Sequence, residues 1–153
     1  MSQPELLSIK IKEVIFGANV KVVEPVNLYE CFIDDDCFVG PFVEIQRKVS
    51  IGKRTRIQSH SFICEGVTIG EDCFIGHGVM FINDLFANGG PAGDPSMWKE
   101  TRIENNVSIG SNATILPVSI CRHTVIAAGA VVTKDITQKG IYAGNPARLL
   151  RPL

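Results

Sequence analysis

Large apolar residues recur at every sixth position through most of this sequence, and this pattern predicts the architecture. It has eighteen positions, twelve of them isoleucine, and only three steps depart from six residues. The positions are Phe16, Val22, Leu28, Ile33, Val39, Ile45, Ile51, Ile57, Ile63, Ile69, Ile75, Phe81, Ile103, Ile109, Ile115, Ile120, Ile126 and Val132. A helical period of 3.6 or a strand period of two does not produce one large aliphatic residue in every six. The chain is therefore expected to be a repeat protein.

Each six-residue unit is expected to form one short strand and one tight corner. The large aliphatic residue and a small or β-branched residue two positions earlier point inward, because side chains alternate along a strand. Gly, Asp, Asn and Lys follow at the corners, as in IGKR at 51–54 and IGED at 69–72. Three units close a triangular coil, and equivalent positions of successive coils stack about 4.8 Å apart.

The repeat predicts an all-β parallel β-helix of about six triangular coils, over about residues 14–135. Two steps are one residue short and fall between coils: Leu28 to Ile33 and Ile115 to Ile120. The 22-residue step from Phe81 to Ile103 also falls between coils. A protruding loop over about residues 82–99 therefore leaves the coils and returns in phase. With a short tail at 136–153, we expect a single domain over residues 1–153.

Composition excludes several classes of function. The 15 Lys and Arg against 16 Asp and Glu give a formal net charge of −1, and no basic run suggests a nucleic-acid partner. No apolar stretch approaches the length of about eighteen residues that spans a membrane. The N-terminal residues lack the apolar segment of a signal peptide. We expect a cytoplasmic protein without a membrane partner.

The five cysteines are expected to be free thiols without a metal. Cys31, Cys37 and Cys73 fall on the small inward position of the repeat, where they serve as packing residues. Cys64 and Cys121 directly follow an inward isoleucine. No pair has metal-ligand spacing, and an odd number argues against a set of disulfides.

Polar corner residues of successive coils form columns, and one column leads into the loop. Arg47, Glu65 and Asn83 are expected about 5 Å apart on successive coils. Asn83 lies in FINDLFANGGPAGDPSMW, residues 81–98, which opens the loop. Two interpretations stay open: a solvated ladder, in which an Arg47–Glu65 pair contributes little, or a binding site of the kind that long loops often form.

The repeat resembles the hexapeptide motif of left-handed parallel β-helix acyltransferases. The segment IGHGVMFINDLF, with IQSHSFICEGVTIG before it and SIGSNATILP after it, is similar to bacterial N-acetyltransferases of nucleotide-linked amino sugars. The resemblance implies left-handed winding, acetyl-CoA as acyl donor and a homotrimer with sites between subunits. It also implies that Asn83, and with it Asp84, lies beside the sugar amino group.

The C-terminal segment VVTKDITQKGIYAGNPARLLR resembles the coenzyme A end of the same family. In that family the last coil and the GNPAR turn border the pantetheine arm and the adenine. The resemblance implies that the cofactor-binding residues are Ala128, Gly129, Lys134, Asn145, Pro146 and Arg148. It does not identify the acceptor.

The acceptor would meet other side chains. Arg47 or Lys48 is expected to bind the nucleotide phosphates through charge-assisted hydrogen bonds. Glu65 is expected to bind a sugar hydroxyl or to pair with Arg47. Trp98 would either stack on the nucleotide base or anchor the loop.

Three histidines are candidates for the base that removes the ammonium proton. His60 and His77 fall on one edge of adjacent coils and His123 on another, so none is expected to reach Asn83 within one chain. His77 or His123 would then act across a subunit interface, while His60 is assigned to the substrate site. Two alternatives stay open: corner histidines bonded only to backbone, and a reaction in which the departing thiolate takes the proton.

The sequence thus predicts an N-acetyltransferase of a nucleotide-linked amino deoxy sugar for surface polysaccharide, such as the O-antigen of lipopolysaccharide. The sugar, its amino position, the acyl group and the nucleotide (UDP or dTDP) stay open. One alternative is an O-acetyltransferase of a sugar or serine hydroxyl with a histidine base. A γ-carbonic-anhydrase-like zinc enzyme needs a His-x4-His spacing, whereas the spacings here are 17 and 46. A purely structural β-helix would need neither the loop nor GNPAR.

Overall fold

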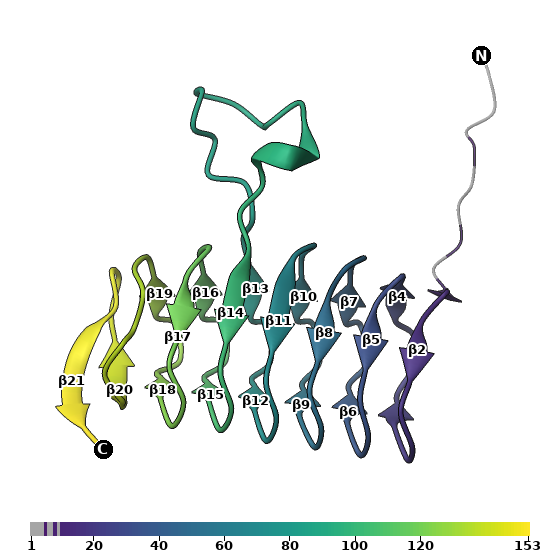
Figure 1. Cartoon of the computed structure of the whole chain (residues 1–153), viewed down its shortest axis with the longest axis horizontal. Helices are drawn as coiled ribbons and strands as arrows, with labels where there is room; N and C mark the ends of the chain where they lie inside the picture. The colour runs from purple at the N-terminus through teal and green to yellow at the C-terminus, as the bar shows by residue number, and fades with distance from the viewer. Residues whose placement is uncertain (1–4, 6–7, 9) are drawn as a thin grey trace.

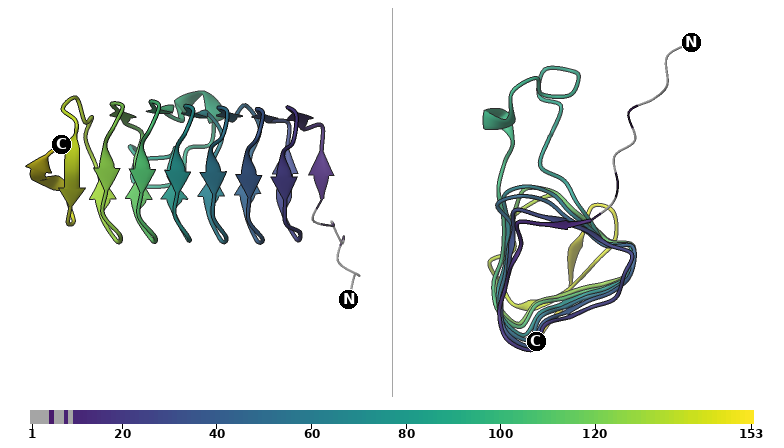
Figure 2. Two further views of the ribbon diagram at one scale, coloured as in Figure 1. Left: turned by 90° about the horizontal axis from the view of Figure 1, so that it is seen from below. Right: turned by 90° about the vertical axis from the view of Figure 1, so that its right-hand side faces the viewer.

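The computed structural model describes residues 5, 8 and 10–153, which form a triangular prism of three parallel sheets (Figures 1 and 2). Sheet A consists of β1 (Ile11–Lys12), β4 (Asn27–Tyr29), β7 (Glu44–Ile45), β10 (Phe62–Ile63), β13 (Met80–Phe81), β16 (Thr114–Ile115) and β19 (Val131–Val132). Sheet B consists of β2 (Ile15–Phe16), β5 (Phe32–Ile33), β8 (Ser50–Ile51), β11 (Val67–Ile69), β14 (Thr101–Ile103) and β17 (Ser119–Ile120). Sheet C consists of β3 (Lys21–Val22), β6 (Phe38–Val39), β9 (Arg56–Ile57), β12 (Phe74–Ile75), β15 (Ser108–Ile109), β18 (Val125–Ile126), β20 (Gly140–Ala143) and β21 (Arg148–Pro152).

Successive strands pass from one sheet to the next, and the fold is the predicted left-handed parallel β-helix. The register pairs equivalent repeat positions: Ile51 lies beside Ile69, and across the loop Ile69 lies beside Ile103. The loop therefore returns in phase, as the sequence predicts. Only β20 and β21 pair antiparallel among the described strands.

The β-helix extends beyond the predicted six coils at both ends. Ile11 pairs with Leu28, which gives sheet A a seventh strand. A bridge joins Ile120 to Ile136 after the last predicted coil, and β20 then pairs with β18. Both additions depart from the six-residue step, so the periodicity does not include them. Phe16 lies near the N-terminal end of the prism and remains 38% exposed.

Stacked isoleucines fill the interior, and buried hydroxyl and thiol groups bind the backbone between coils. At the small inward position, five side chains each donate a hydrogen bond to a backbone carbonyl of the next coil. These pairs are Cys37 to Gly52, Thr55 to Gly70, Ser61 to Gly76, Cys73 to Glu104 and Thr101 to Leu116. These five side chains therefore link neighbouring coils instead of remaining unsatisfied.

The cysteines are free thiols, as predicted. Four of them are buried, at 4% exposure or less, and Cys121 is half-buried. Burial raises the pKa of the Cys31 thiol to about 11 and that of Cys64 to about 12. Packing is therefore the role that the structure gives to the buried four.

Tight corners create three edges along the prism. Most corners place the third residue after the inward aliphatic residue in the left-handed region, as for Lys48 (φ 59°) and Arg54 (φ 58°). The loop edge joins sheet A to sheet B and carries Arg47, Lys48 and Glu65. The ladder edge joins sheet B to sheet C, and the histidine edge joins sheet C to sheet A.

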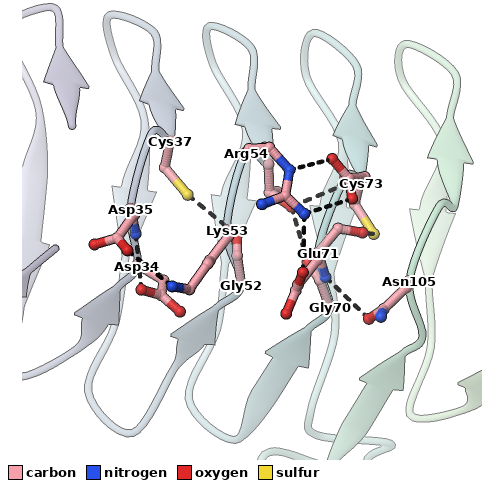
Figure 3. Close-up of polar contacts among 12 residues, drawn as sticks. Asp34, Asp35, Cys37, Gly52, Lys53, Arg54, Gly70, Glu71, Cys73 and Asn105 are labelled. Carbon is pink, nitrogen blue, oxygen red and sulfur yellow. Dashed lines mark hydrogen bonds and ion pairs between the residues drawn. The ribbon is translucent and has the colours of Figure 1, made fainter. Parts of the chain in front are cut away.

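The ladder edge is a chain of ionic contacts between coils (Figure 3). Lys53 Nζ lies 2.8 Å from Asp35 Oδ2. Arg54 bonds Glu71 at 2.9 Å and Asp72 at 2.7 Å on the following coil. These groups are solvent-exposed, so each pair contributes little to stability, but together they fix the outward direction of the corner side chains.

The interrupting loop, residues 82–100, projects from the loop edge between β13 and β14 (Figure 1). Its one helical turn is the 3-10 helix η1 (Pro95–Met97), which Asp94 caps by accepting a hydrogen bond from Ser96 N at 2.8 Å. The base of the loop is closed because Lys99 N donates to Asn83 O at 2.9 Å. No helix within the described residues has the length and apolarity needed to cross a membrane.

Candidate functional site

A pocket of about 300 Å³ lies against sheet B under the end of the loop. Its lining residues are Lys48, Glu65, Gly66, Thr68, Pro95, Ser96, Trp98, Lys99 and Glu100. Three of these belong to the predicted substrate site: Lys48, Glu65 and Trp98. The structure therefore brings the corner column and the loop together around one cavity, which we call the loop pocket.

Glu65 is the electrostatic centre of the loop pocket. Its carboxylate, only 9% exposed, accepts hydrogen bonds from Arg47 Nε at 2.6 Å and Lys48 Nζ at 2.7 Å. Desolvation acts to raise the pKa of Glu65, but the hydrogen bonds and charges of Lys48 and Arg47 outweigh it, and the pKa falls below its ordinary value. The predicted Arg47–Glu65 pair is confirmed. The solvated-ladder interpretation is wrong for Glu65, because this carboxylate is buried.

Asn83 is held at the base of the loop with one side-chain atom free for another partner. Its Nδ2 donates to the backbone oxygen of Glu65 at 3.3 Å, and its own backbone oxygen accepts from Lys99. No described residue donates a hydrogen bond to its Oδ1. An amide oxygen in this state is able to accept a hydrogen bond from an amino group.

Asp84 shapes the loop rather than the pocket. Its Oδ1 accepts from Phe86 N at 2.9 Å and its Oδ2 from Ala92 N at 2.7 Å. Both carboxylate oxygens thus bind loop backbone, and Asp84 is not among the residues that line the loop pocket. An acceptor amine would have to share these oxygens with the backbone.

The three histidines lie on the other two edges. His77 Nδ1 is 2.9 Å from Ser59 Oγ on the preceding coil of the histidine edge. His60, also on that edge, stacks on Phe42 with ring centroids 4.8 Å apart. His123 lies on the ladder edge, and none of the three lines the loop pocket. Within one chain they are separated from Asn83, as the sequence predicts.

The structure brings together four of the six predicted coenzyme A residues. Two hydrogen bonds tie the turn after β20 to Val131. Val131 N donates to Gly144 O at 2.9 Å, and Ala147 N donates to Val131 O at 2.8 Å. The turn that contains Asn145 and Pro146 is thus held at the start of β19, which the corner of Ala128 and Gly129 directly precedes. Lys134 lies at the opposite end of β19, and Arg148 begins β21.

A second pocket, of about 250 Å³, opens further along sheet B and was not predicted. Its lining residues are Thr68, Gly70, Arg102, Ile103, Glu104, Asn105 and Arg122. Thr68 and Arg102 occupy the outward position before an inward isoleucine, so alternation alone predicts that they face solvent. Lys99 and Glu100 in the loop pocket carry no such signal, because the loop has no period.

Metal ligation has no support among the residues that the structure describes. No group of three or more His, Cys, Asp or Glu side chains in this part of the chain is placed to hold a metal ion. The coordination of a zinc enzyme needs such a group.

Comparison with known proteins identifies relatives of the repeat. Residues 48–80 and 100–134 match the family described as the hexapeptide repeat of succinyl-transferase. The bifunctional protein GlmU of Heliobacterium modesticaldum is 33% identical over 139 residues, which cover 78% of this chain and 28% of that protein. The chain thus spans about a quarter of the length of the curated relatives that it matches first.

Two solved structures illustrate the similarity in fold. The hexapeptide-repeat acetyltransferase VCA0836 of Vibrio cholerae, in complex with acetyl coenzyme A, is 29% identical with a TM-score of 0.66, covering 76% of this chain and 68% of that one. A mutant perosamine N-acetyltransferase of Caulobacter crescentus, in complex with CoA and GDP-perosamine, is 18% identical with a TM-score of 0.63. It covers 92% of this chain and 57% of that one, and at this identity shows the shared fold alone.

Proposed function

We propose, from the premise that the chain is a hexapeptide-repeat protein with the left-handed β-helix fold of acetyltransferases, that it acetylates an amino group. The donor is acetyl-CoA, and the acceptor is a nucleotide-linked amino deoxy sugar. Its product would serve surface polysaccharide synthesis, including O-antigen. The observation that carries the proposal is the loop pocket, where the buried Glu65 carboxylate and the Trp98 indole meet at the interruption of the repeat. The Asn83 amide does not line this pocket but is bonded to the backbone of Glu65 beside it.

The reaction requires a neutral amine held in a defined direction. The amine lone pair attacks the thioester carbonyl carbon, the C–N bond forms, the C–S bond breaks, and the nitrogen loses one proton to give an amide and a thiol. Asn83 Oδ1 is suited to accept a hydrogen bond from the amine. This bond would direct the lone pair of the amine nitrogen away from the loop base. The Glu65 carboxylate beneath it is suited to bind a sugar hydroxyl.

The proton has two possible destinations, and the structure favours one within a single chain. No histidine lines the loop pocket, so a histidine base would have to come from a neighbouring subunit, with His77 or His123 as the candidates. His77 has an orienting partner in Ser59. Without such a subunit, the departing thiolate takes the proton. A homotrimer with sites between prisms belongs to this proposal, and its mass in solution is the direct test.

The coenzyme A arm is proposed to follow the C-terminal end of the prism. Ala128 and Gly129 precede β19, and the turn with Asn145 and Pro146 is hydrogen-bonded to its first residue; we assign these four residues to the cofactor surface. Lys134 and Arg148 would contribute charge from its margins. Gly129, with φ 70°, turns the corner without a side chain, and no described heavy atom lies near the position of its missing Cβ.

The test is a screen of UDP- and dTDP-linked 3- and 4-amino sugars with acetyl-CoA, followed by thiol release and by mass of the product. We expect a mass increase for an amino sugar and none for the matched hydroxy sugar. Asn83→Ala is expected to reduce kcat/KM by about tenfold or more, since a positioned hydrogen bond is lost. Asn112→Ala, on the histidine edge, is the matched control. Acetylation of a hydroxyl group but of no amine would replace the proposal by an O-acetyltransferase.

A further inference from the structure

The second pocket on sheet B has the composition of an anion site. Arg102 and Arg122 line it together with a single carboxylate, Glu104, so two cations face one anion. Arg102 makes no ion pair with any residue that the structure describes. Arg122 meets Glu104 only through its Nε, at 3.5 Å, while its backbone N–H takes the same oxygen at 3.0 Å. The forked ends of both guanidinium groups are therefore open to a ligand.

Further donors surround these arginines. Asn105 Oδ1 already accepts from Glu71 N at 3.0 Å, which leaves its NH2 group as a donor (Figure 3). Thr68 adds an exposed hydroxyl group. The backbone packs closely beneath, because a Cβ on Gly70 would lie 2.8 Å from Asn105 N. The pocket thus offers donors of several kinds and only one carboxylate.

The loop pocket is less suited to a phosphate. Of the two lysines that line it, Lys48 already binds the buried Glu65 carboxylate at 2.7 Å, which Arg47 also binds at 2.6 Å. The other, Lys99, lines the pocket together with a second carboxylate, Glu100. A phosphate would have to compete with these carboxylates or approach them, and like charges at close range are unfavourable. The two arginines of the second pocket face no such competition beyond Glu104.

The two pockets are neighbours on sheet B. Thr68 lines both of them, on the central strand β11 of sheet B. Arg102 pairs in register with Ser119, and Arg122 follows three residues later at the corner after β17. The two arginines therefore come from adjacent coils, one on the face of sheet B and one at its ladder edge. Both guanidinium groups line the same pocket on long side chains, and each is able to bind one of two neighbouring phosphate groups bidentately.

We infer that Arg102, Arg122 and Asn105 form a subsite for a pyrophosphate group, reached from the loop pocket across Thr68. Two ligands of the proposed reaction carry this group, the nucleoside-diphosphate sugar and coenzyme A. The inference rests on the proposed function for the identity of its ligand. It moves phosphate recognition from Arg47 and Lys48, just before β8, to Arg102 on β14 and Arg122 after β17, two and three coils further along the prism.

The test is calorimetric titration of the full chain with UDP, dTDP and coenzyme A in separate arms. Arg102→Ala and Arg122→Ala are each expected to raise the dissociation constant about tenfold or more, and Arg102→Lys by less, because lysine keeps the charge but not the fork. Arg56→Ala is the control, since Arg56 lies on sheet C with its guanidinium 4.6 Å from the Phe38 ring centroid. Thermal unfolding of each variant shows that the fold is retained.

The arm that responds identifies the source of the pyrophosphate: the nucleotides indicate the acceptor and coenzyme A indicates the donor. Dissociation constants that stay within twofold for both alanine variants in every arm would overturn the subsite. So would a wild-type chain that binds none of these ligands. Arginine-dependent binding without acetylation of any amino sugar refutes the proposed function and leaves the subsite standing. Acetylation that Arg102→Ala leaves unchanged refutes the subsite alone.

Discussion

Thr55→Val is expected to destabilise the prism, although the change replaces one fully buried side chain by another of the same shape. Thr55 lies at the small inward position before β9 and is 0% exposed. Its hydroxyl donates to Gly70 O at 2.8 Å and accepts from Cys73 N at 3.0 Å. Valine has no hydroxyl group, so the Gly70 carbonyl and the Cys73 N–H on the next coil both lose their partner.

The magnitude follows from these two groups. A buried polar group left without a partner costs about 1–3 kcal/mol, and carbonyls tolerate the loss better than N–H groups. We therefore expect Thr55→Val to lower the free energy of unfolding by about 2–3 kcal/mol. For a chain of this length that corresponds to a decrease in Tm of about 4–12 °C.

Thr124 provides a matched control at the same repeat position of another coil in sheet C. It is also 0% exposed, but its hydroxyl contacts only Cys121 Sγ, at 3.4 Å, and binds no backbone group. Thr124→Val is expected to cost less than about 1 kcal/mol, since a weak contact is lost and no N–H is left unpaired.

Urea and thermal unfolding by circular dichroism, at one fixed protein concentration, measure both variants against the wild type. Fixing the concentration matters because any subunit association makes the midpoint concentration-dependent. Equal shifts for Thr55→Val and Thr124→Val would refute the reasoning, because the hydrogen bonds of Thr55 would then contribute nothing beyond burial of its side chain.

Two further outcomes are expected. Glu65→Gln should lower the urea midpoint at pH 7, because it removes the negative charge that Arg47 and Lys48 share. The folded-state pKa of Glu65 lies below its ordinary value of 4.5. The stabilisation is therefore present above pH 4.5 and is lost as the pH falls through the folded-state pKa. A difference from wild type that persists unchanged at pH 3 would contradict this. Iodoacetamide at pH 8 should label Cys121 before Cys31 and Cys64, because burial raises the pKa values of Cys31 and Cys64 to about 11 and about 12. Peptide mass spectrometry measures the order of labelling. Equal labelling rates at Cys64 and Cys121 would contradict this prediction.

The fold could be predicted from the sequence because its inward apolar positions recur every six residues. Ile69 and Ile103 lie side by side although a loop separates them, and counting sixes gives this result directly. The Arg47–Glu65 contact follows from the same count. The same count did not predict the strand pairing of Ile11 or Ile136, because the chain ends are held by local pairing rather than by a full repeat.

The site was predictable mainly where it lies on the coils; Trp98 was the one loop residue of the pocket that was expected in it. Lys48, Glu65 and Trp98 were expected near one another, and they line one pocket. Lys99 and Glu100 were missed, since a loop without regular hydrogen bonding gives no rule for where its side chains point. The role of Asp84 in the loop depends on the backbone of Phe86 and Ala92, which no spacing rule supplies.

The closed base of the loop has a consequence for how such a protein can change. Because the hydrogen bond from Lys99 N to Asn83 O joins the two ends of the insertion, everything between them can vary in length and chemistry while the neighbouring coils keep their register. Substitutions in the loop would then alter its side of the loop pocket without disturbing the coils. Exchange of the loop, about fifteen residues between Asn83 and Lys99, would then change specificity with little effect on the stability of the prism.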